Sequence, residues 1–202
     1  MSEHLKGCAF VELPQEEAKE ALSAGVQRFG PVTVAALVGW GGVREFLLPL
    51  KSFVTRFVLI ELNRWTLLLN DMYGETCFVD ALGMSKQTGC IATSAYLHED
   101  SRQWHVLQGG EVVRSVVCYR DGDKWVFEQR GTAGPWEDVN TYRARRLRDR
   151  LTPNQVARYI HAVTGLSYPP PWSSVVKDVI GVERSTKDVV EQIRKWDVQV
   201  DV

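Results

Sequence analysis

The side chains that could bind a metal or act as a nucleophile are scattered along this chain, without the spacings that such sites use. No two histidines lie four residues apart, and no cysteine belongs to a C-x-x-C pair. His98, Glu99 and Asp100 are consecutive, but neighbouring residues of a strand point to opposite faces, which favours a solvated turn over a metal site. There is also no G-x-S-x-G motif. We therefore expect no metal, no cofactor and no catalytic nucleophile.

A glycine-rich stretch, residues 39–42, follows an apolar run, where phosphate-binding loops occur. It lacks the Lys-Ser/Thr of a P-loop and the G-x-G-x-x-G spacing. The pattern predicts a flexible loop that presents Trp40. Because tryptophan is frequent among the residues that dominate protein interfaces, Trp40 and Trp136 are candidate contacts for a protein partner.

Five arginines between residues 143 and 150 form the strongest charge feature of the chain. On a helix, Arg143, Arg146 and Arg150 would share one face, which could contact phosphates. Acidic neighbours favour a solvated or ion-paired face instead. A nucleic-acid-associated regulatory protein that uses this helix remains an alternative.

Acidic residues gather in the predicted loops, as Glu99 with Asp100, Asp121 with Asp123, and Glu137 with Asp138. No spacing fixes two of these carboxylates on one face, so general acid–base catalysis is not indicated, and solvated turns or partner contacts are the two interpretations. An enzyme with a dispersed active site also remains an alternative.

The composition bounds the class of protein. The chain has 202 residues, with 24 basic and 25 acidic side chains and a formal net charge of −1, a balance that argues against a dedicated nucleic-acid binder. The first residues lack the pattern of a signal peptide, so the four cysteines are expected to be free thiols and the chain cytoplasmic. The longest apolar runs are far shorter than the ~20 residues of a membrane span.

Residues 1–52 are expected to form a β-α-β part. A strand is predicted at 7–13, a helix from Pro14 to Gly30, and a second strand at 32–38. The segment 43–50 is ambiguous between helix and strand.

Residues 53–130 are expected to form an antiparallel meander with a short helix at 75–86. The predicted strands are 53–62, 65–70, 90–97, 103–107, 111–120 and 124–129. Short turns at Gly109-Gly110 and at Asp121-Gly122-Asp123 require antiparallel neighbours.

Residues 137–202 are expected to be helical. Helices are predicted at 142–150, from Thr152 to Gly165, at 174–180 and at 185–196, and Thr152-Pro153 with Gln155 is a typical N-terminal capping sequence. The sequence thus predicts one α+β domain over 1–202, a largely antiparallel meander with an N-terminal helix and with C-terminal helices packed on one face.

Residues 53–165 resemble a group of small bacterial immunity proteins that accompany polymorphic or contact-delivered toxins. The resemblance lies in Trp65-Thr-Leu-Leu-Leu-Asn70, in Gly110-Glu-Val-Val-Arg114, and in the run from Asp121 to Glu128 with Gly131, followed by helices that close at Gly165. It implies a protein without catalytic residues that binds and blocks a cognate toxin.

The resemblance and the missing catalytic motifs lead to one functional expectation. The protein is expected to neutralise a bacterial toxin by occluding its active site, with no membrane partner and with nucleic acid a less favoured partner than protein. Its expected contact residues are Trp40, Glu99, Asp100, Asp121, Asp123 and Trp136.

Overall fold

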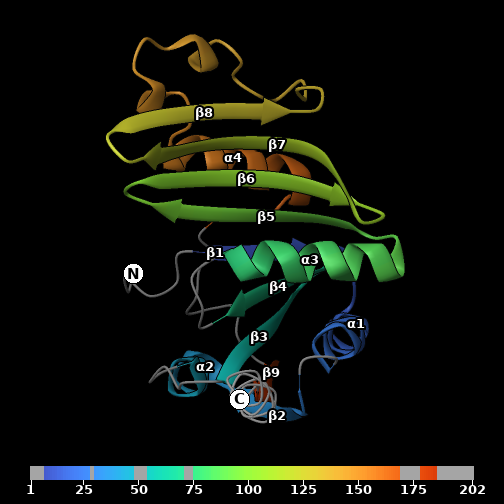
Figure 1. Ribbon diagram of the computed structural model, residues 1–202. Helices are drawn as coiled ribbons and strands as arrows, with labels where there is room; N and C mark the ends of the chain where they lie inside the picture. The colour runs from blue at the N-terminus through green and yellow to red at the C-terminus, as the bar shows by residue number, and fades with distance from the viewer. Residues whose placement is uncertain (1–6, 28–29, 48–53, 71–74, 169–177, 186–202) are drawn as a thin grey trace, which may run out of the picture.

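The computed structural model describes residues 7–27, 30–47, 54–70, 75–168 and 178–185 (Figure 1). Its strands are β1 (Gly7–Val11), β2 (Val32–Val38), β3 (Val54–Leu62), β4 (Trp65–Asn70), β5 (Ile91–His98), β6 (Ser101–Gln108), β7 (Glu111–Asp121), β8 (Lys124–Arg130) and β9 (Asp178–Ser185). Its helices are α1 (Gln15–Gln27), α2 (Gly39–Leu47), α3 (Glu75–Thr88) and α4 (Pro153–Thr164), with two 3₁₀ turns, η1 (Thr141–Arg143) and η2 (Leu147–Asp149).

The nine strands form one sheet in the order β2-β9-β3-β4-β1-β5-β6-β7-β8. All the pairings are antiparallel, so the predicted α+β class with a largely antiparallel sheet is confirmed. The expected meander is divided, because β1 lies between β4 and β5. Strand β9 likewise lies between β2 and β3, so segments from both ends of the chain are internal strands of the sheet.

The predicted hairpin turns form where expected. Asn63 joins β3 to β4 with a φ of 60°, and Gly109, Gly110 and Gly122 have positive φ in the turns that follow β6 and β7. Gly110 is also required by packing, since a Cβ there would lie 2.7 Å from the Cβ of Lys86 on α3.

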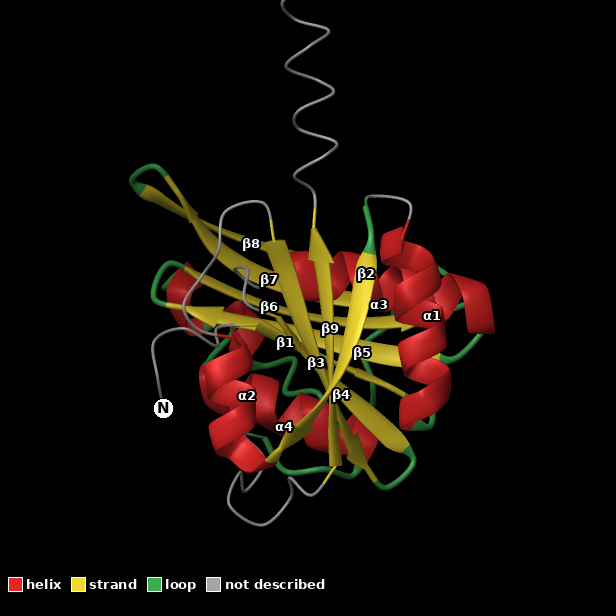
Figure 2. Ribbon diagram, turned by 90° about the horizontal axis from the view of Figure 1, so that it is seen from below, coloured by secondary structure: helices red, strands yellow, loops and turns green. Residues whose placement is uncertain are grey.

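Helices cover both faces of the sheet (Figure 2). Helices α1 and α3 bury Leu22 and Met84 against strand residues such as Leu59 and Leu68. Helices α2 and α4 pack on the opposite face, where Val43 and Ile160 join a core built around Trp65 and Trp104. We call these the α3 face and the α4 face.

Helix α4 begins and ends as its sequence predicts. The hydroxyl of Thr152 accepts a hydrogen bond from the Gln155 N–H, and the Gln155 side chain accepts one from the Thr152 N–H. Gly165 ends the helix in the left-handed conformation, with φ 73°.

Several predictions from local sequence are wrong. Residues 39–42 begin helix α2 instead of forming a loop, because burial of Val43 and Leu47 against the sheet outweighs the low helix propensity of glycine. Asp178–Ile180, predicted to be helical, belong to β9, where Val179 and Val182 are buried between β2 and β3. The rest of the helix predicted at 174–180, and the helix predicted at 185–196 beyond Ser185, lie outside the described residues.

No helix within the described ranges is both long and apolar enough to cross a membrane.

Replacing Thr152 with Ala should lower the free energy of unfolding by about 1 kcal/mol, because the Gln155 N–H loses its acceptor. Chemical denaturation measures the change. Thr152→Ser keeps the hydroxyl and should stay close to the unmodified protein. An equal loss in both variants would contradict a capping role.

Candidate functional site

Two acidic turns that are separate in sequence meet at one end of the sheet. The β5–β6 turn carries Glu99 and Asp100, and the β7–β8 turn carries Asp121 and Asp123. Arg120 joins the turns, with Nη1 3.7 Å from Asp100 Oδ1 and Nη2 3.5 Å from Asp123 Oδ1. Its backbone N–H also donates to the Asp100 carbonyl at 2.8 Å. These four of the six predicted contact residues therefore form one surface, which we call the acidic end.

Only part of this negative charge is balanced. Arg120 pairs with Asp100 and Asp123, whereas Glu99 and Asp121 make no ion pair with any described residue. All four carboxylates are exposed. The acidic end can therefore attract a cationic partner at little desolvation cost.

Next to the acidic end, the α3 face of β5 to β8 is incompletely covered. Helix α3 packs mainly on β1, β5 and part of β6, and no described helix lies in front of β7 and β8 (Figure 1). The strand register places a set of exposed or partly exposed side chains on this surface, which we call the open face: Tyr96, His98, Gln103, Val117, Tyr119, Lys124, Val126, Glu128 and Arg130.

The open face is negative near Tyr119. The Glu128 carboxylate raises the pKa of Tyr119, with smaller contributions from burial, from Asp121 and from the hydrogen bond between Tyr119 and Glu128. The Tyr96 and His98 rings stack 6.3 Å apart on the neighbouring part of the same face.

The two predicted tryptophan contacts lie elsewhere. Trp136 is 37% exposed and packs on Trp104 and Tyr159 of the α4 face, with ring centroids 5.4 and 5.6 Å away. Trp40 lies in the first turn of α2, beside β2, β3 and β9, and its side chain is outside the described part of the structure. Neither belongs to the acidic end.

The basic segment does not form the expected helix. Residues 142–150 contain two 3₁₀ turns separated by extended backbone at Ala144 and Arg146, so the arginines do not line one helical face. Side chains of the sheet donate hydrogen bonds to the backbone carbonyls of this segment. Arg102 donates to the carbonyls of Arg148 and Leu151, and Cys118 donates to that of Leu147. Arg150 folds back on the Ala144 carbonyl.

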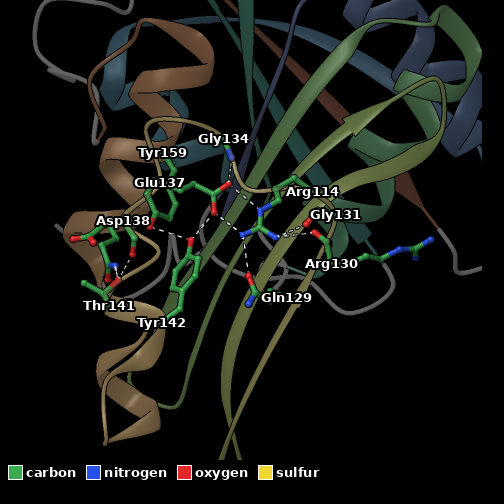
Figure 3. Close-up of polar contacts among 11 residues, drawn as sticks. Arg114, Gln129, Arg130, Gly131, Gly134, Glu137, Asp138, Thr141, Tyr142 and Tyr159 are labelled. Carbon is green, nitrogen blue, oxygen red and sulfur yellow. Dashed lines mark hydrogen bonds and ion pairs between the residues drawn. The ribbon is translucent and has the colours of Figure 1, made fainter.

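A buried ion pair, which the sequence analysis missed, anchors this segment (Figure 3). Arg114 on β7 binds Glu137 in a bidentate manner, with Nε–Oε1 2.9 Å and Nη2–Oε2 2.6 Å. The Glu137 side chain is 0% exposed, which corrects its interpretation as a solvated loop acid. The Tyr142 hydroxyl donates to Glu137 Oε2 at 2.6 Å and lies 3.0 Å from the Tyr159 hydroxyl.

Every N–H of the Arg114 guanidinium has an acceptor. Besides the two contacts with Glu137, it donates to the carbonyls of Arg130 and Gly131 and to the side chain of Gln129. Burial would raise the pKa of Glu137, but hydrogen bonds from Arg114, Tyr142 and the Gly134 N–H outweigh it and lower that pKa. The fully bonded pair has no free group for catalysis, so we assign it a structural role.

One signal in the sequence could have revealed this pair. Arg114, Val116 and Cys118 alternate along one strand and therefore share a face. A charge in line with core residues requires a buried partner of opposite charge. The sequence does not indicate that the partner is Glu137.

His105 is the buried titratable group closest to the open face. It is 9% exposed on β6, its ring lies 4.6 Å from that of Phe78 on α3, and its Nδ1 has no hydrogen-bond partner. Burial lowers the pKa of His105 to about 4.

The four cysteines are free thiols, and burial raises the pKa of Cys8 to about 12. Over the described residues, no group of three or more histidine, cysteine, aspartate or glutamate side chains is arranged to hold a metal ion.

Comparison of the chain with protein-family models, with curated proteins and with solved structures gives no match.

Glu137→Gln should lower the free energy of unfolding by about 3–5 kcal/mol at neutral pH, because Arg114 is left as a buried charge without its counterion. Urea denaturation measures the loss. The double variant Arg114→Met/Glu137→Leu removes both charges. Its free energy of unfolding should fall by clearly less than the sum of the losses in the single variants Arg114→Met and Glu137→Leu. Additive losses would contradict the coupling.

Stability should fall on acidification from about pH 6.5 toward pH 4, because unfolded His105 binds a proton at its ordinary pKa of roughly 6.5 while folded His105 resists it until about pH 4. His105→Gln should remove this dependence, which amounts to about 3 kcal/mol at most. Denaturation at pH 7, 5.5 and 4.5 tests it. The stability that Glu137 contributes is lost only at lower pH, as the pH falls through its lowered pKa. An unchanged slope between pH 6.5 and 4.5 in His105→Gln would refute the assignment.

Proposed function

We propose that this protein binds a cognate bacterial toxin in the cytoplasm and neutralises it by occluding the toxin's active site. The observation that carries the proposal is the convergence of Glu99, Asp100, Asp121 and Asp123 from two separate hairpins. Support also comes from the resemblance of residues 53–165 to immunity proteins.

The acidic end has the properties of a capture surface. Its carboxylates are held on short hairpin turns, so little backbone freedom is lost on binding. Complementary charge accelerates association with a basic surface and excludes partners of like charge. A toxin that acts on nucleic acid needs a basic active-site cleft, and such a cleft is the partner chemistry that these turns fit.

The basic segment is the weaker candidate surface. Arg102 and Arg150 are committed to backbone carbonyls and also lie over the rings of Trp125 and Phe127. Of the other arginines in the segment, Arg143 lies in η1, Arg148 lies in η2, and Arg145 and Arg146 lie between the two turns. A continuous phosphate-binding face is therefore not supported, and binding of a protein is the better proposal.

Co-expression with the toxin encoded beside the protein's gene tests the function. The protein should rescue growth and co-purify with the toxin. The double variant Glu99→Lys/Asp121→Lys should weaken the complex by about tenfold or more, because like charges then face the basic cleft. Neither residue forms an ion pair with a described residue, so folding should be unaffected.

The matched control is Glu17→Lys/Glu20→Lys on α1, which changes the net charge equally at exposed positions that lie away from the acidic end. It should bind like the unmodified protein. Absence of both rescue and a complex would disprove the immunity function, and equal weakening by both double variants would show that the acidic end is not the contact.

A further inference from the structure

The open face carries more aromatic and apolar side chains than a solvated sheet surface needs. Tyr96 and His98 on β5 and Tyr119 on β7 are all partly exposed, and Val117 and Val126 lie between or beside them. Tyrosine is enriched at protein interfaces because its ring buries a large area while its hydroxyl stays polar. Within the described residues, only α3 approaches this surface, from the β1 side.

The rings form two platforms in a defined arrangement. The register places His98, Ser101 and Tyr119 in one row across β5, β6 and β7. Since neighbouring strands lie about 4.8 Å apart, the His98 and Tyr119 positions are roughly 10 Å apart. The residue between them is the small Ser101, and both rings are partly exposed.

The acidic end and the open face together carry a net negative charge. Five carboxylates, those of the acidic end and Glu128, stand against three cations, Arg120, Lys124 and Arg130, which leaves −2. Glu128 makes no ion pair with a described residue and is hydrogen-bonded to Tyr119. The charge of Glu128 is also the main cause of the raised pKa of Tyr119.

We propose that the open face is a second recognition surface, on which a lysine- or arginine-bearing segment of the partner protein binds with a cationic side chain over the Tyr119 ring and beside the Glu128 carboxylate. The stacked rings of Tyr96 and His98 hold a second part of the same segment. This proposal rests on the proposed function for the identity of the partner, and it adds where the partner lies and which chemistry it presents.

A cation satisfies both groups at this position. The face of a tyrosine ring attracts an ammonium or guanidinium group, and the adjacent carboxylate supplies the opposite charge. An anionic segment would be repelled by Glu128, and a purely apolar one would leave the charge of Glu128 desolvated without a counterion. The occupant is therefore cationic, and the adjoining acidic end extends the same complementarity.

The probe of this surface is a hexalysine peptide. Its binding is monitored through the amide chemical shifts of the full-length, isotope-labelled protein. We expect saturable, salt-sensitive shifts at Tyr96, Tyr119, Glu128 and their strand neighbours. Glu128→Gln should weaken peptide binding about threefold, as expected for one exposed charge pair. Tyr119→Ala should weaken it similarly, while Tyr119→Phe, which keeps the ring, should retain most of the affinity.

The control is Glu17→Gln, which removes an equal charge on α1 and should leave the affinity unchanged. Shifts centred on α1, no saturable shifts, or equal affinity for Glu128→Gln and the unmodified protein would each overturn the proposal. Failure of the proposed function gives a different result, since the peptide would then bind the open face while no toxin complex forms. If the toxin complex depends on Glu99 and Asp121 but tolerates Glu128→Gln and Tyr119→Ala, the function stands and the open face is not part of the interface.

Discussion

The buried ion pair between Arg114 and Glu137 holds together the half of the molecule that carries the candidate site. Among the described residues, no long helix packs along the α4 face of strands β7 and β8, and the segment from Gly131 to Leu151 covers it instead. Arg114 fixes that segment through Glu137 and through two backbone carbonyls. A buried charge tolerates only a geometry that satisfies all its hydrogen bonds, so the pair selects one path for a segment with little regular structure.

The consequences of this pair extend to the core. Glu137 accepts the hydroxyl hydrogen bond of Tyr142, whose ring packs on Phe127, and Tyr142 in turn contacts Tyr159 of α4. Helix α4 is thereby joined to the covering segment as well as to the sheet. With the α4 face covered in this way, β7 and β8 are packed on one side, as an antiparallel sheet allows, and no described helix covers their open face. This arrangement suits a binding protein, because its rigid strands hold the contact side chains without requiring a cavity.

The acidic end forms because the strand order brings residues that are distant in sequence to the same end of the sheet. Glu99 and Asp123 lie on turns that are more than a strand apart in sequence, yet alternate turns of an antiparallel meander fall at the same end of the sheet. Arg120 then holds the two turns together. The tryptophans expected to join them do not, since Trp136 packs on the other face and Trp40 belongs to a helix beside the far strands.

The sequence by itself determined the features that depend on neighbouring residues. Glycines with positive φ define the β6–β7 and β7–β8 turns, and Thr152 with Gln155 and Gly165 defines α4. Only the tertiary structure decided that Asp178–Ser185 is a strand, that residues 142–150 form two short turns, and that Glu137 is buried. In each of these cases the partners lie far away in sequence, such as β2 and β3 for β9, or Arg114 for Glu137. Packing against distant partners contributes more free energy than local propensity, which differs by less than about 1 kcal/mol per residue for ordinary side chains, and therefore determines the structure of these segments.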